Sequence, residues 1–318
     1  MGHSEDIVPC IRCLQCYHVS TDHKNVQCSV NPRFNREKRV PLILPVTGHP
    51  KHLVIVGGGP AGITCALTAS RRGHQVTLLE KEPVLTGKLN IACHGEHKAD
   101  LRRFRDYLLT QLRKSSVTVH TGVLADTDVV RDLKPDALVI AVGATPSRIP
   151  LPGVDGDNCI QISEFLQSPD TSLQHYIIIG GGSVGCETAL DLAEKGKDVS
   201  IIEMADCLAS ASNDLYRLAL SEHFARYDNL HTYLNSACQS IDADGVNVLT
   251  NGASTHISGD KVLLSLGFRP DAKQVSSLYG IVPDTYYVGD CERVATVAEA
   301  VNNAYFIGAN VFQEQDII

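Results

Sequence analysis

The stretch that decides the fold is Lys51-His-Leu-Val-Ile-Val-Gly-Gly-Gly-Pro-Ala-Gly62. It starts as a short apolar run rich in β-branched residues, typical of a buried strand, and ends in a glycine-rich turn. Residues 61–72 then place Ala, Leu and Ile at helical spacing, and residues 75–79 form an expected second strand that leads into Glu80. This order of strand, glycine turn, helix, strand and acid predicts a dinucleotide-binding unit.

Each residue type in the turn has a physical task. Gly57 permits the tight turn, Gly59 lets the backbone approach a pyrophosphate, and Gly62 lets helix and strand pack closely. The helix start at Pro60-Ala61 offers unpaired N–H groups and partial positive charge to phosphates. Glu80 would accept hydrogen bonds from the adenosine ribose hydroxyls. A glycine turn without a ligand is the alternative, and the agreement of all these elements disfavours it.

The pattern occurs a second time further along the chain. Residues 176–179 are an apolar run, a helix is expected over residues 184–195, and a strand over residues 198–202. The expected cofactor-binding positions of this second unit are Gly180, Gly182, Ser183, Val184, Gly185 and Glu203. No Arg or Lys occurs in Met204 to Asp206 to receive a 2′-phosphate, which a carboxylate would repel, so NAD(H) is favoured over NADP(H).

Composition limits the class of protein. The 318 residues suffice for two domains, and the 20% charged and 43% apolar residues are typical of a globular protein. A net charge of −8 argues against nucleic acid or an anionic membrane as partner. No apolar run is long enough for a membrane span, and Met1 to Asp6 are not followed by the apolar stretch of a signal peptide. We therefore expect a cytoplasmic protein.

Four of the eleven cysteines lie together near the N-terminus. Cys10, Cys13, Cys16 and Cys28 follow the spacing C-x2-C-x2-C-x11-C, which suits a 4Fe–4S cluster with three ligands from one loop and a fourth from further on. A four-thiolate zinc site is the main alternative, although it typically uses two separated C-x2-C pairs, and no metal at all is the other. The remaining cysteines are expected to be small core residues: Cys65, Cys93, Cys159, Cys186, Cys207, Cys238 and Cys291.

Later stretches carry a resemblance to flavoproteins. They are Asp136-Ala-Leu-Val-Ile-Ala-Val-Gly-Ala-Thr-Pro146, Leu263-Leu-Ser-Leu-Gly-Phe-Arg-Pro270, and Tyr287-Val-Gly-Asp-Cys291 followed by Ala298-Glu-Ala300. The first two resemble the outgoing and return crossovers of two-dinucleotide flavoprotein reductases, with Gly143 and Gly267 at their turns. The third resembles the second flavin motif of these reductases. This resemblance implies that Asp290 binds the ribityl chain and that the helix start near Ala298 approaches the flavin ring or the pyrophosphate.

A closer resemblance covers nearly the whole chain. Residues 5–13, 28–32 and 185–190 resemble the C-terminal half of an iron–sulfur flavoprotein family that includes 2,4-dienoyl-CoA reductase, enoate reductases and trimethylamine dehydrogenase. The resemblance implies FAD, NAD and a 4Fe–4S cluster as cofactors. Family members normally begin with a TIM barrel that holds FMN and the substrate, and this chain starts where that barrel would end. A separate FMN-binding barrel subunit or domain is therefore an expected partner.

Two further residues gain a role from the resemblance. The Gly-x-Glu pattern of related reductases implies that Glu187 lies near the nicotinamide, with a packing carboxylate as the alternative. Lys88 occupies a position where the family often has Gln beside the flavin, and a cation there would stabilise reduced, anionic flavin. A solvated lysine is the alternative. No catalytic acid, base or nucleophile is expected, because the cofactors carry the chemistry.

These observations predict an α/β protein with two Rossmann-like domains, parallel sheets and helices on both faces of each sheet. Residues 1–47 would form the iron–sulfur segment and linker. Residues 48–150 and 265–318 would form the FAD domain, and residues 151–264 the inserted NAD domain.

The expected function is an NADH-dependent oxidoreductase that passes electrons through FAD and the cluster to an FMN-containing partner of old-yellow-enzyme type. One alternative is a structural module that holds ADP instead of FAD, as in trimethylamine dehydrogenase-like proteins. The other is a reductase like the small chain of glutamate synthase, whose N-terminal domain carries more cysteines.

Overall fold

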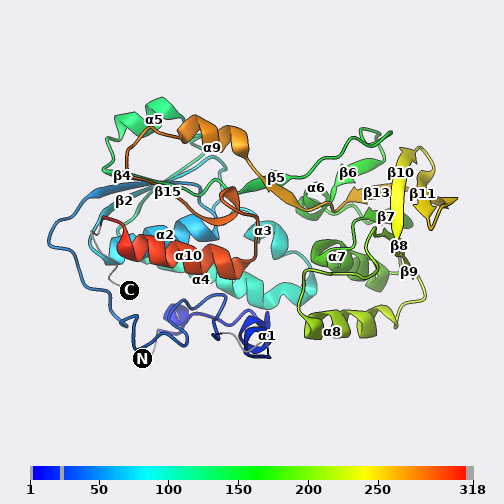
Figure 1. Ribbon diagram of the computed structural model, residues 1–318, viewed down its shortest axis with the longest axis horizontal. Helices are drawn as coiled ribbons and strands as arrows, with labels where there is room; N and C mark the ends of the chain where they lie inside the picture. The colour runs from blue at the N-terminus through cyan, green and yellow to red at the C-terminus, as the bar shows by residue number, and fades with distance from the viewer. Residues whose placement is uncertain (1–2, 22–24, 313–318) are drawn as a thin grey trace. The chain divides into compact units, whose positions relative to one another are not determined.

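The computed structural model describes residues 3–21 and 25–312, which form two compact units (Figure 1). The first unit is Met1–Thr145 with Arg269–Ile318, and Pro146–Phe268 is inserted into it as the second. The chain passes between the units at strands β5 (Ala144–Pro146) and β14 (Phe268–Pro270), which pair with each other. Both boundaries between the units fall within these connecting strands, so the second unit extends a few residues beyond the expected range 151–264 at each end.

The first unit is built on a five-stranded parallel sheet of order β15-β4-β1-β2-β3. Its strands are β1 (His52–Val56), β2 (Gln75–Glu80), β3 (Thr118–Thr121), β4 (Ala137–Ile140) and β15 (Thr285–Tyr287). Alternate residues of β1 enter two different cores, Leu53 and Ile55 on one face and Val54 and Val56 on the other. A sheet buried on both faces explains why its central strands are continuous apolar runs.

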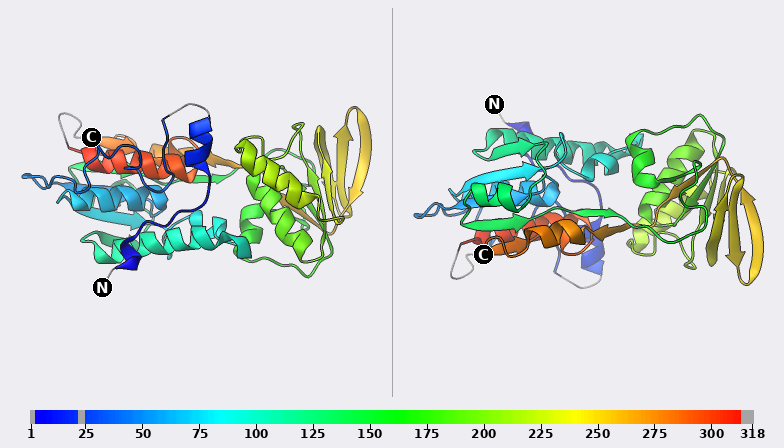
Figure 2. Two further views of the ribbon diagram at one scale, coloured as in Figure 1. Left: turned by 90° about the horizontal axis from the view of Figure 1, so that it is seen from below. Right: turned by 90° about the horizontal axis from the view of Figure 1, so that it is seen from above.

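Helices cover both faces of this sheet (Figures 1 and 2). One face carries α2 (Pro60–Arg71), α4 (Ala99–Lys114) and α10 (Val297–Asn310), and the other carries α5 (Thr127–Asp132) and α9 (Ala272–Leu278). Shorter helices are η1 (Ser4–Asp6), α1 (Gln15–Thr21), α3 (Leu89–Ala92), η2 (Glu96–Lys98) and η3 (Gly289–Cys291). Within the described ranges, no helix has the length and apolar character needed to cross a membrane.

The second unit also has a five-stranded parallel sheet, of order β6-β13-β7-β8-β9. Its strands are β6 (Cys159–Gln161), β7 (His175–Ile179), β8 (Asp198–Ile202), β9 (Leu230–Tyr233) and β13 (Lys261–Leu264). Helices α6 (Ile162–Gln167), α7 (Ser183–Glu194) and α8 (Asp214–Phe224) lie on one face. The expectation of helices on both faces is wrong here, because an antiparallel sheet covers the other face (Figure 2). This sheet consists of β10 (Ser236–Asp242), β11 (Gly245–Thr250) and β12 (Ala253–Ser258).

The N-terminal segment, expected over residues 1–47 as the iron–sulfur segment and linker, is grouped with the first unit. Val30 lies in the main core of that unit, and Val40 and Leu44 pack with Tyr305 and Ala309 of α10. These buried apolar contacts attach the segment to the body of the unit.

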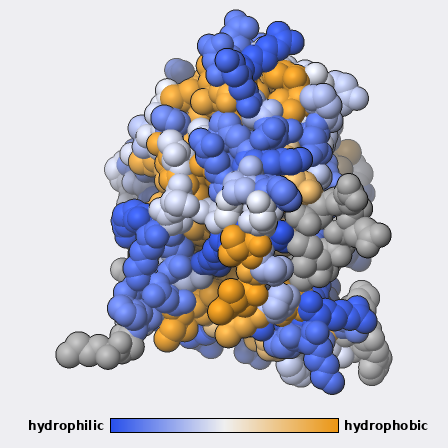
Figure 3. All heavy atoms as spheres, turned by 90° about the vertical axis from the view of Figure 1, so that its left-hand side faces the viewer, coloured by the Kyte–Doolittle hydropathy of each residue, from blue (hydrophilic) through white to orange (hydrophobic). Residues whose placement is uncertain are grey.

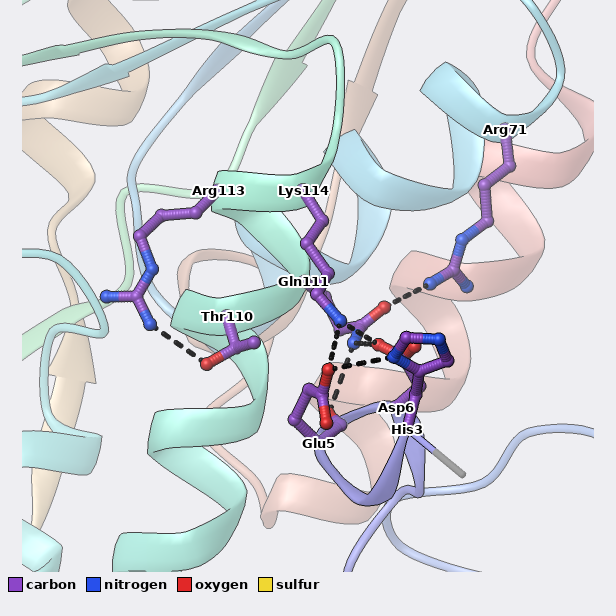
Figure 4. Close-up of polar contacts among 8 residues, drawn as sticks. All are labelled: His3, Glu5, Asp6, Arg71, Thr110, Gln111, Arg113 and Lys114. Carbon is purple, nitrogen blue, oxygen red and sulfur yellow. Dashed lines mark hydrogen bonds and ion pairs between the residues drawn. The ribbon is translucent and has the colours of Figure 1, made fainter. Parts of the chain in front are cut away.

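Polar contacts hold the start of the segment on α4. Lys114 Nζ donates to Glu5 Oε1 at 2.9 Å and to Asp6 Oδ1 at 2.8 Å, and Gln111 Nε2 donates to Asp6 Oδ1 at 2.8 Å (Figure 4). Arg113, the residue before Lys114, is bonded to Thr110 of its own helix. The loop that carries Cys10, Cys13 and Cys16 (the cysteine loop, residues 10–16) therefore follows a segment that is fixed to α4.

Candidate functional site

The turn between β1 and α2 is closed so tightly that only glycine fits at two positions. Gly57 has φ +112°, and a Cβ on it would lie 2.2 Å from the carbonyl oxygen of Ala141. A Cβ on Gly62 would lie 1.8 Å from the carbonyl oxygen of Gly57. The structure thus gives Gly57 the conformation of a tight turn and Gly62 the position of a close helix–strand approach.

Gly59 has a different environment. No described atom lies within 4 Å of where its Cβ would stand, and its extended backbone at φ −74° is open to any residue. Gly59 precedes α2, which starts at Pro60, followed by Ala61, and among the described residues no side chain caps this start. The first-turn N–H groups therefore lie at the positive end of a helix that no described side chain caps, and these features fit a pyrophosphate.

The acid at the end of β2 is attached to the same turn. Glu80 is buried, and its Oε2 accepts a hydrogen bond from the N–H of Gly58 at 2.6 Å. Its Oε1 accepts from the N–H of Glu82 at 2.9 Å. Each carboxylate oxygen can accept a second hydrogen bond, so the fixed carboxylate can still bind ribose hydroxyls.

The second unit repeats this geometry. Gly180 has φ +105°, and a Cβ on it would lie 2.3 Å from the carbonyl oxygen of Ser265. A Cβ on Gly185 would lie 2.2 Å from the carbonyl oxygen of Gly180, whereas no described atom lies within 4 Å of the corresponding point on Gly182. Among the described side chains, none caps the start of α7. By contrast, side chains cap α5, α8, α9 and α10.

The acid of the second unit is held in the same way as Glu80. Oε2 of Glu203 accepts from the N–H of Gly181 at 2.6 Å, and Oε1 accepts from the N–H of Ala205 at 2.8 Å. Met204 beside it is exposed. The two glycine N–H groups that orient these acids were not anticipated from the sequence, although the middle glycine of each turn was visible there.

The first turns of α7 carry three more predicted residues. The hydroxyl of Ser183 lies 2.8 Å from that of Ser212, and Val184 is exposed. Glu187 accepts a hydrogen bond at Oε1 from the hydroxyl of Tyr216 on α8, at 3.0 Å. Burial and the neighbouring Glu187 carboxylate raise the pKa of Tyr216, so this tyrosine remains a neutral donor. The sequence did not predict a role for Tyr216, because only the fold brings this residue of α8 next to α7.

Lys88 and Asp290 are far apart in sequence and form an ion pair between Lys88 Nζ and Asp290 Oδ2. A Cβ on Gly87 would lie 3.5 Å from Cα of Gly59, and one on Gly289 would lie 2.9 Å from Cβ of Ala61. The segments bearing Lys88 and Asp290 therefore both adjoin the first glycine turn. The structure brings these two predicted residues together there.

The remaining predicted positions in the crossovers and in α10 have distinct environments. Gly143 and Gly267 have φ +75° and +74°, and no described atom lies within 4 Å of the Cβ position of either. Ala298 is buried, and its N–H donates to Oγ1 of Thr296 at 3.1 Å. Thr296 and Glu299 form a capping box, a Thr-x-x-Glu signal that sequence reasoning missed. The N–H of Ala298 thus already has an acceptor within the chain.

The four N-terminal cysteines lie in one region of the first unit. Cys10, Cys13 and Cys16 are exposed and Cys28 is half-buried. Cys10 Sγ accepts a hydrogen bond from the N–H of Arg12 at 3.4 Å, and Cys13 Sγ lies 3.0 Å from the hydroxyl of Ser29, next to Cys28. The Cys28 carbonyl accepts from the amide of Asn302 on α10 at 3.0 Å. The loop of Cys13 and the segment of Cys28 are therefore adjacent.

The distances between the sulfur atoms bear on which metal group the four N-terminal thiols could hold. Within the described residues, the sole group of three or more ligand atoms all within 4.8 Å of one another is the exposed set His3, Glu5 and Asp6. No three of the four N-terminal thiols are thus that close together. Around one zinc ion, with Zn–S bonds of about 2.3 Å, tetrahedral thiolates stand about 3.8 Å apart.

The other cysteines are mostly buried and poorly suited to redox or nucleophilic work. Burial raises the pKa of Cys65 and Cys186 to about 12, and that of Cys159 and Cys238 to about 11. Burial also raises the pKa of Cys93. Thiols with raised pKa values are rarely thiolates at neutral pH, so they are inert.

Comparison with known proteins agrees with this geometry. The sequence profile of the pyridine nucleotide-disulphide oxidoreductases matches residues 51–304. The chain therefore belongs to the pyridine nucleotide-disulphide oxidoreductase family, a class of NAD(P)H-dependent flavoprotein oxidoreductases. The α/β fold with two Rossmann-like units, the flavoprotein class and the predicted resemblance are confirmed.

Individual relatives narrow the likeness. The chain is 32% identical over 320 residues to NADH oxidase of Thermoanaerobacter brockii, covering 96% of this chain and 48% of that protein. It is 31% identical over 312 residues to bilirubin reductase of Mediterraneibacter gnavus, covering 98% and 48%. The solved structure of 2-naphthoyl-CoA reductase superposes with a TM-score of 0.90 at 28% identity, covering 96% and 47%. The chain thus spans about half the length of these relatives.

Proposed function

We propose that the chain is an NADH-dependent electron-transfer module of this family. FAD binds at the first glycine turn, NAD(H) binds at the second, and Cys10, Cys13, Cys16 and Cys28 hold a 4Fe–4S cluster. With these groups bound, the available chemistry is hydride transfer from NADH to FAD and single-electron transfer through the cluster. The observation that carries the proposal is the duplicated turn, with a fixed acid and a helix start that no described side chain caps in each unit.

The chain's own residues would bind and orient the two dinucleotides. The N–H groups at the starts of α2 and α7 would hold pyrophosphates, while Glu80 and Glu203 would accept from ribose hydroxyls. The preference for NADH over NADPH is supported by Glu203, which would repel a 2′-phosphate, and by exposed Met204 beside it. Glu187, oriented by Tyr216, is proposed to lie near the nicotinamide.

FAD is favoured over ADP by residues beyond the glycine turn. A bound ADP would require only the turn and Glu80, whereas Lys88 and Asp290 add a polar pair that adjoins the turn. Asp290 would bind the ribityl chain, and the Lys88 cation would favour an anionic reduced flavin. Gly143, Gly267 and Ala298 remain proposed contributors through their backbone. A scaffold that binds ADP is thus a weaker hypothesis than an FAD site.

A cluster is favoured over zinc by the donor set. No three of the four thiols lie within 4.8 Å of one another, whereas the thiolates around one zinc ion would stand about 3.8 Å apart. The N–H of Arg12 donates to Cys10 Sγ, and the hydroxyl of Ser29 lies within hydrogen-bond distance of Cys13 Sγ. Hydrogen bonds to sulfur are among the features that tune the potential of an iron–sulfur cluster. The spacing of the four cysteines differs from the two separated C-x2-C pairs that are typical of zinc sites. Their number is smaller than the cysteine set of a glutamate synthase-type chain.

The electron acceptor is proposed to be an FMN-containing barrel of old-yellow-enzyme type, in a separate subunit or elsewhere in the same polypeptide. Seven of the sixteen exposed large apolar side chains among the described residues fall within residues 7–46. They are Ile7, Leu14, Tyr17, Phe34, Leu42, Ile43 and Val46. Figure 3 shows apolar groups at the surface between hydrophilic ones on one face of the molecule. The number of exposed apolar side chains in residues 7–46 supports a covering partner.

Anaerobic purification with cofactor analysis tests the proposal. We expect about four irons per chain from a cubane cluster, and release of FAD on acid extraction. NADH should bleach the flavin faster than NADPH. Zinc in place of iron would contradict the cluster, and ADP in place of FAD would contradict the flavin site.

A further inference from the structure

One buried carboxylate holds two exposed guanidinium groups beside the cysteine loop. Asp100, in the first turn of α4, has a side chain only 13% exposed. Its Oδ2 accepts from Nε of Arg12, and its Oδ1 faces Nη1 of Arg103 at 3.4 Å. The side chains of Arg12 and Arg103 are 75% and 72% exposed. Because each guanidinium carries five N–H donors, most donors of both remain directed to solvent.

Arg12 belongs to the cysteine loop itself. It lies between Cys10 and Cys13, and its N–H donates to Cys10 Sγ at 3.4 Å. Its backbone has φ +50°, a left-handed conformation that is uncommon for a residue other than glycine. Such a conformation persists where the surroundings fix it, and here the bond to Asp100 fixes the side chain. The Arg12 guanidinium is thus a preorganised part of the loop.

The helix that carries Asp100 and Arg103 is basic, although the protein as a whole is acidic. Helix α4 carries five basic and two acidic side chains, whereas the whole chain has a net charge of −8. Leu14 and Tyr17, which follow in the cysteine segment, are also exposed. Arginine with tyrosine is the composition that protein interfaces favour over lysine-rich surface.

We propose that Arg12 and Arg103, bridged by Asp100, form a docking site for carboxylate side chains of an acidic electron-transfer partner. The proposal rests on the electron-transfer role given above and names the chemistry of the partner's surface. Paired guanidiniums suit carboxylates because their planar N–H groups bind both oxygens. Docking here would bring the partner to the exposed Cys10, Cys13 and Cys16.

The direct test uses a fluorescein-labelled decaglutamate peptide and the full chain with its cofactors, with binding followed by anisotropy at low and at 150 mM salt. Arg12→Gln and Arg103→Gln should each weaken binding about two- to fivefold at low salt, as expected for one exposed ion pair. Arg103→Lys, which keeps the charge, should retain most of the affinity. Arg113→Gln is the matched control, because Arg113 lies on the same helix and is bonded to Thr110, and it should bind like wild type.

A second measurement connects the site to electron transfer. NADH-driven reduction of ferricyanide, an anion, should fall in the Arg103→Gln variant, whereas reduction of hexaammineruthenium(III), a cation, should not fall. Flavin bleaching by NADH should be unchanged. Equal peptide binding by the Arg12, Arg103 and Arg113 variants would overturn the proposal, as would tighter binding of an oligonucleotide of equal charge. Peptide binding is measured without NADH and without electron transfer, so its failure is distinct from failure of the proposed function.

Discussion

Replacing Gly59 by alanine should impair only the FAD site, and replacing Gly182 by alanine should impair only the NADH site. Both glycines have extended backbone, at φ −74° and −68°, and no described atom lies within 4 Å of either Cβ position. Alanine therefore fits both positions in the free protein. It should stabilise the fold by about 0.4–1 kcal/mol, because it reduces the freedom of the unfolded chain.

The cost should appear when the dinucleotide binds. A methyl group at Gly59 would stand where a pyrophosphate must approach the N–H groups of α2. Hydrogen bonds to charged groups contribute about 1.5–3 kcal/mol each, so loss of one or two weakens FAD binding by about 3 kcal/mol. That change is about 100-fold in Kd. Gly182→Ala should weaken NADH binding by a similar factor and leave FAD in place.

The assay combines thermal unfolding of the apoprotein, FAD released per chain, and the NADH dependence of flavin bleaching. Gly62→Ala is the contrasting control, because its Cβ would lie 1.8 Å from the carbonyl oxygen of Gly57 and should destabilise the apoprotein itself. Unchanged FAD affinity in Gly59→Ala, or loss of FAD with normal NADH binding in Gly182→Ala, would refute the proposed pyrophosphate contacts.

Two other predictions concern charge. Replacing Glu203 by Ser together with Met204→Arg should narrow or reverse the preference for NADH in flavin bleaching, and equal rates with both nucleotides in the wild type would contradict the role of Glu203. Hydrogen bonding from Lys114 lowers the pKa of Glu5 from its ordinary value of 4.5 to about 2. This contact should therefore stabilise the N-terminal segment above pH 4.5 and be lost as the pH falls towards 2. Lys114→Met should speed proteolysis of the segment at neutral pH, whereas Arg113→Met should not, and equal cleavage of both would disprove the contact's role.

The parts of the fold that the sequence predicted are those with local signals. In both units the glycine turn, the helix after it and the terminal acid follow one another closely in sequence, so their order could be predicted. The expected ends of β1, α2, β7 and α7 differ from the observed ends by at most one residue. The antiparallel sheet was missed, although Asn251-Gly252 between β11 and β12 is a hairpin signal. Asn251 and Gly252 have φ +50° and +86°, as such a turn requires.

Contacts between distant parts of the chain could not be predicted. Lys88 and Asp290 were each singled out, but their pairing depends on η3 packing against the start of α2. The attachment of the cysteine segment depends on Val30 entering the main core, and on side chains of α4 and α10. Such contacts follow from the tertiary fold and leave no pattern at fixed spacing.

Anaerobic titration with NADH, followed by optical and paramagnetic resonance spectroscopy, tests the central claim most directly. We expect that NADH bleaches the flavin and that an iron–sulfur signal then appears. In the Cys13→Ala variant the flavin should still bleach, but the iron–sulfur signal should be absent. A wild-type chain that shows no iron–sulfur signal, or a Cys13 variant with the full signal, would contradict electron transfer from NADH through FAD to a cluster on these cysteines.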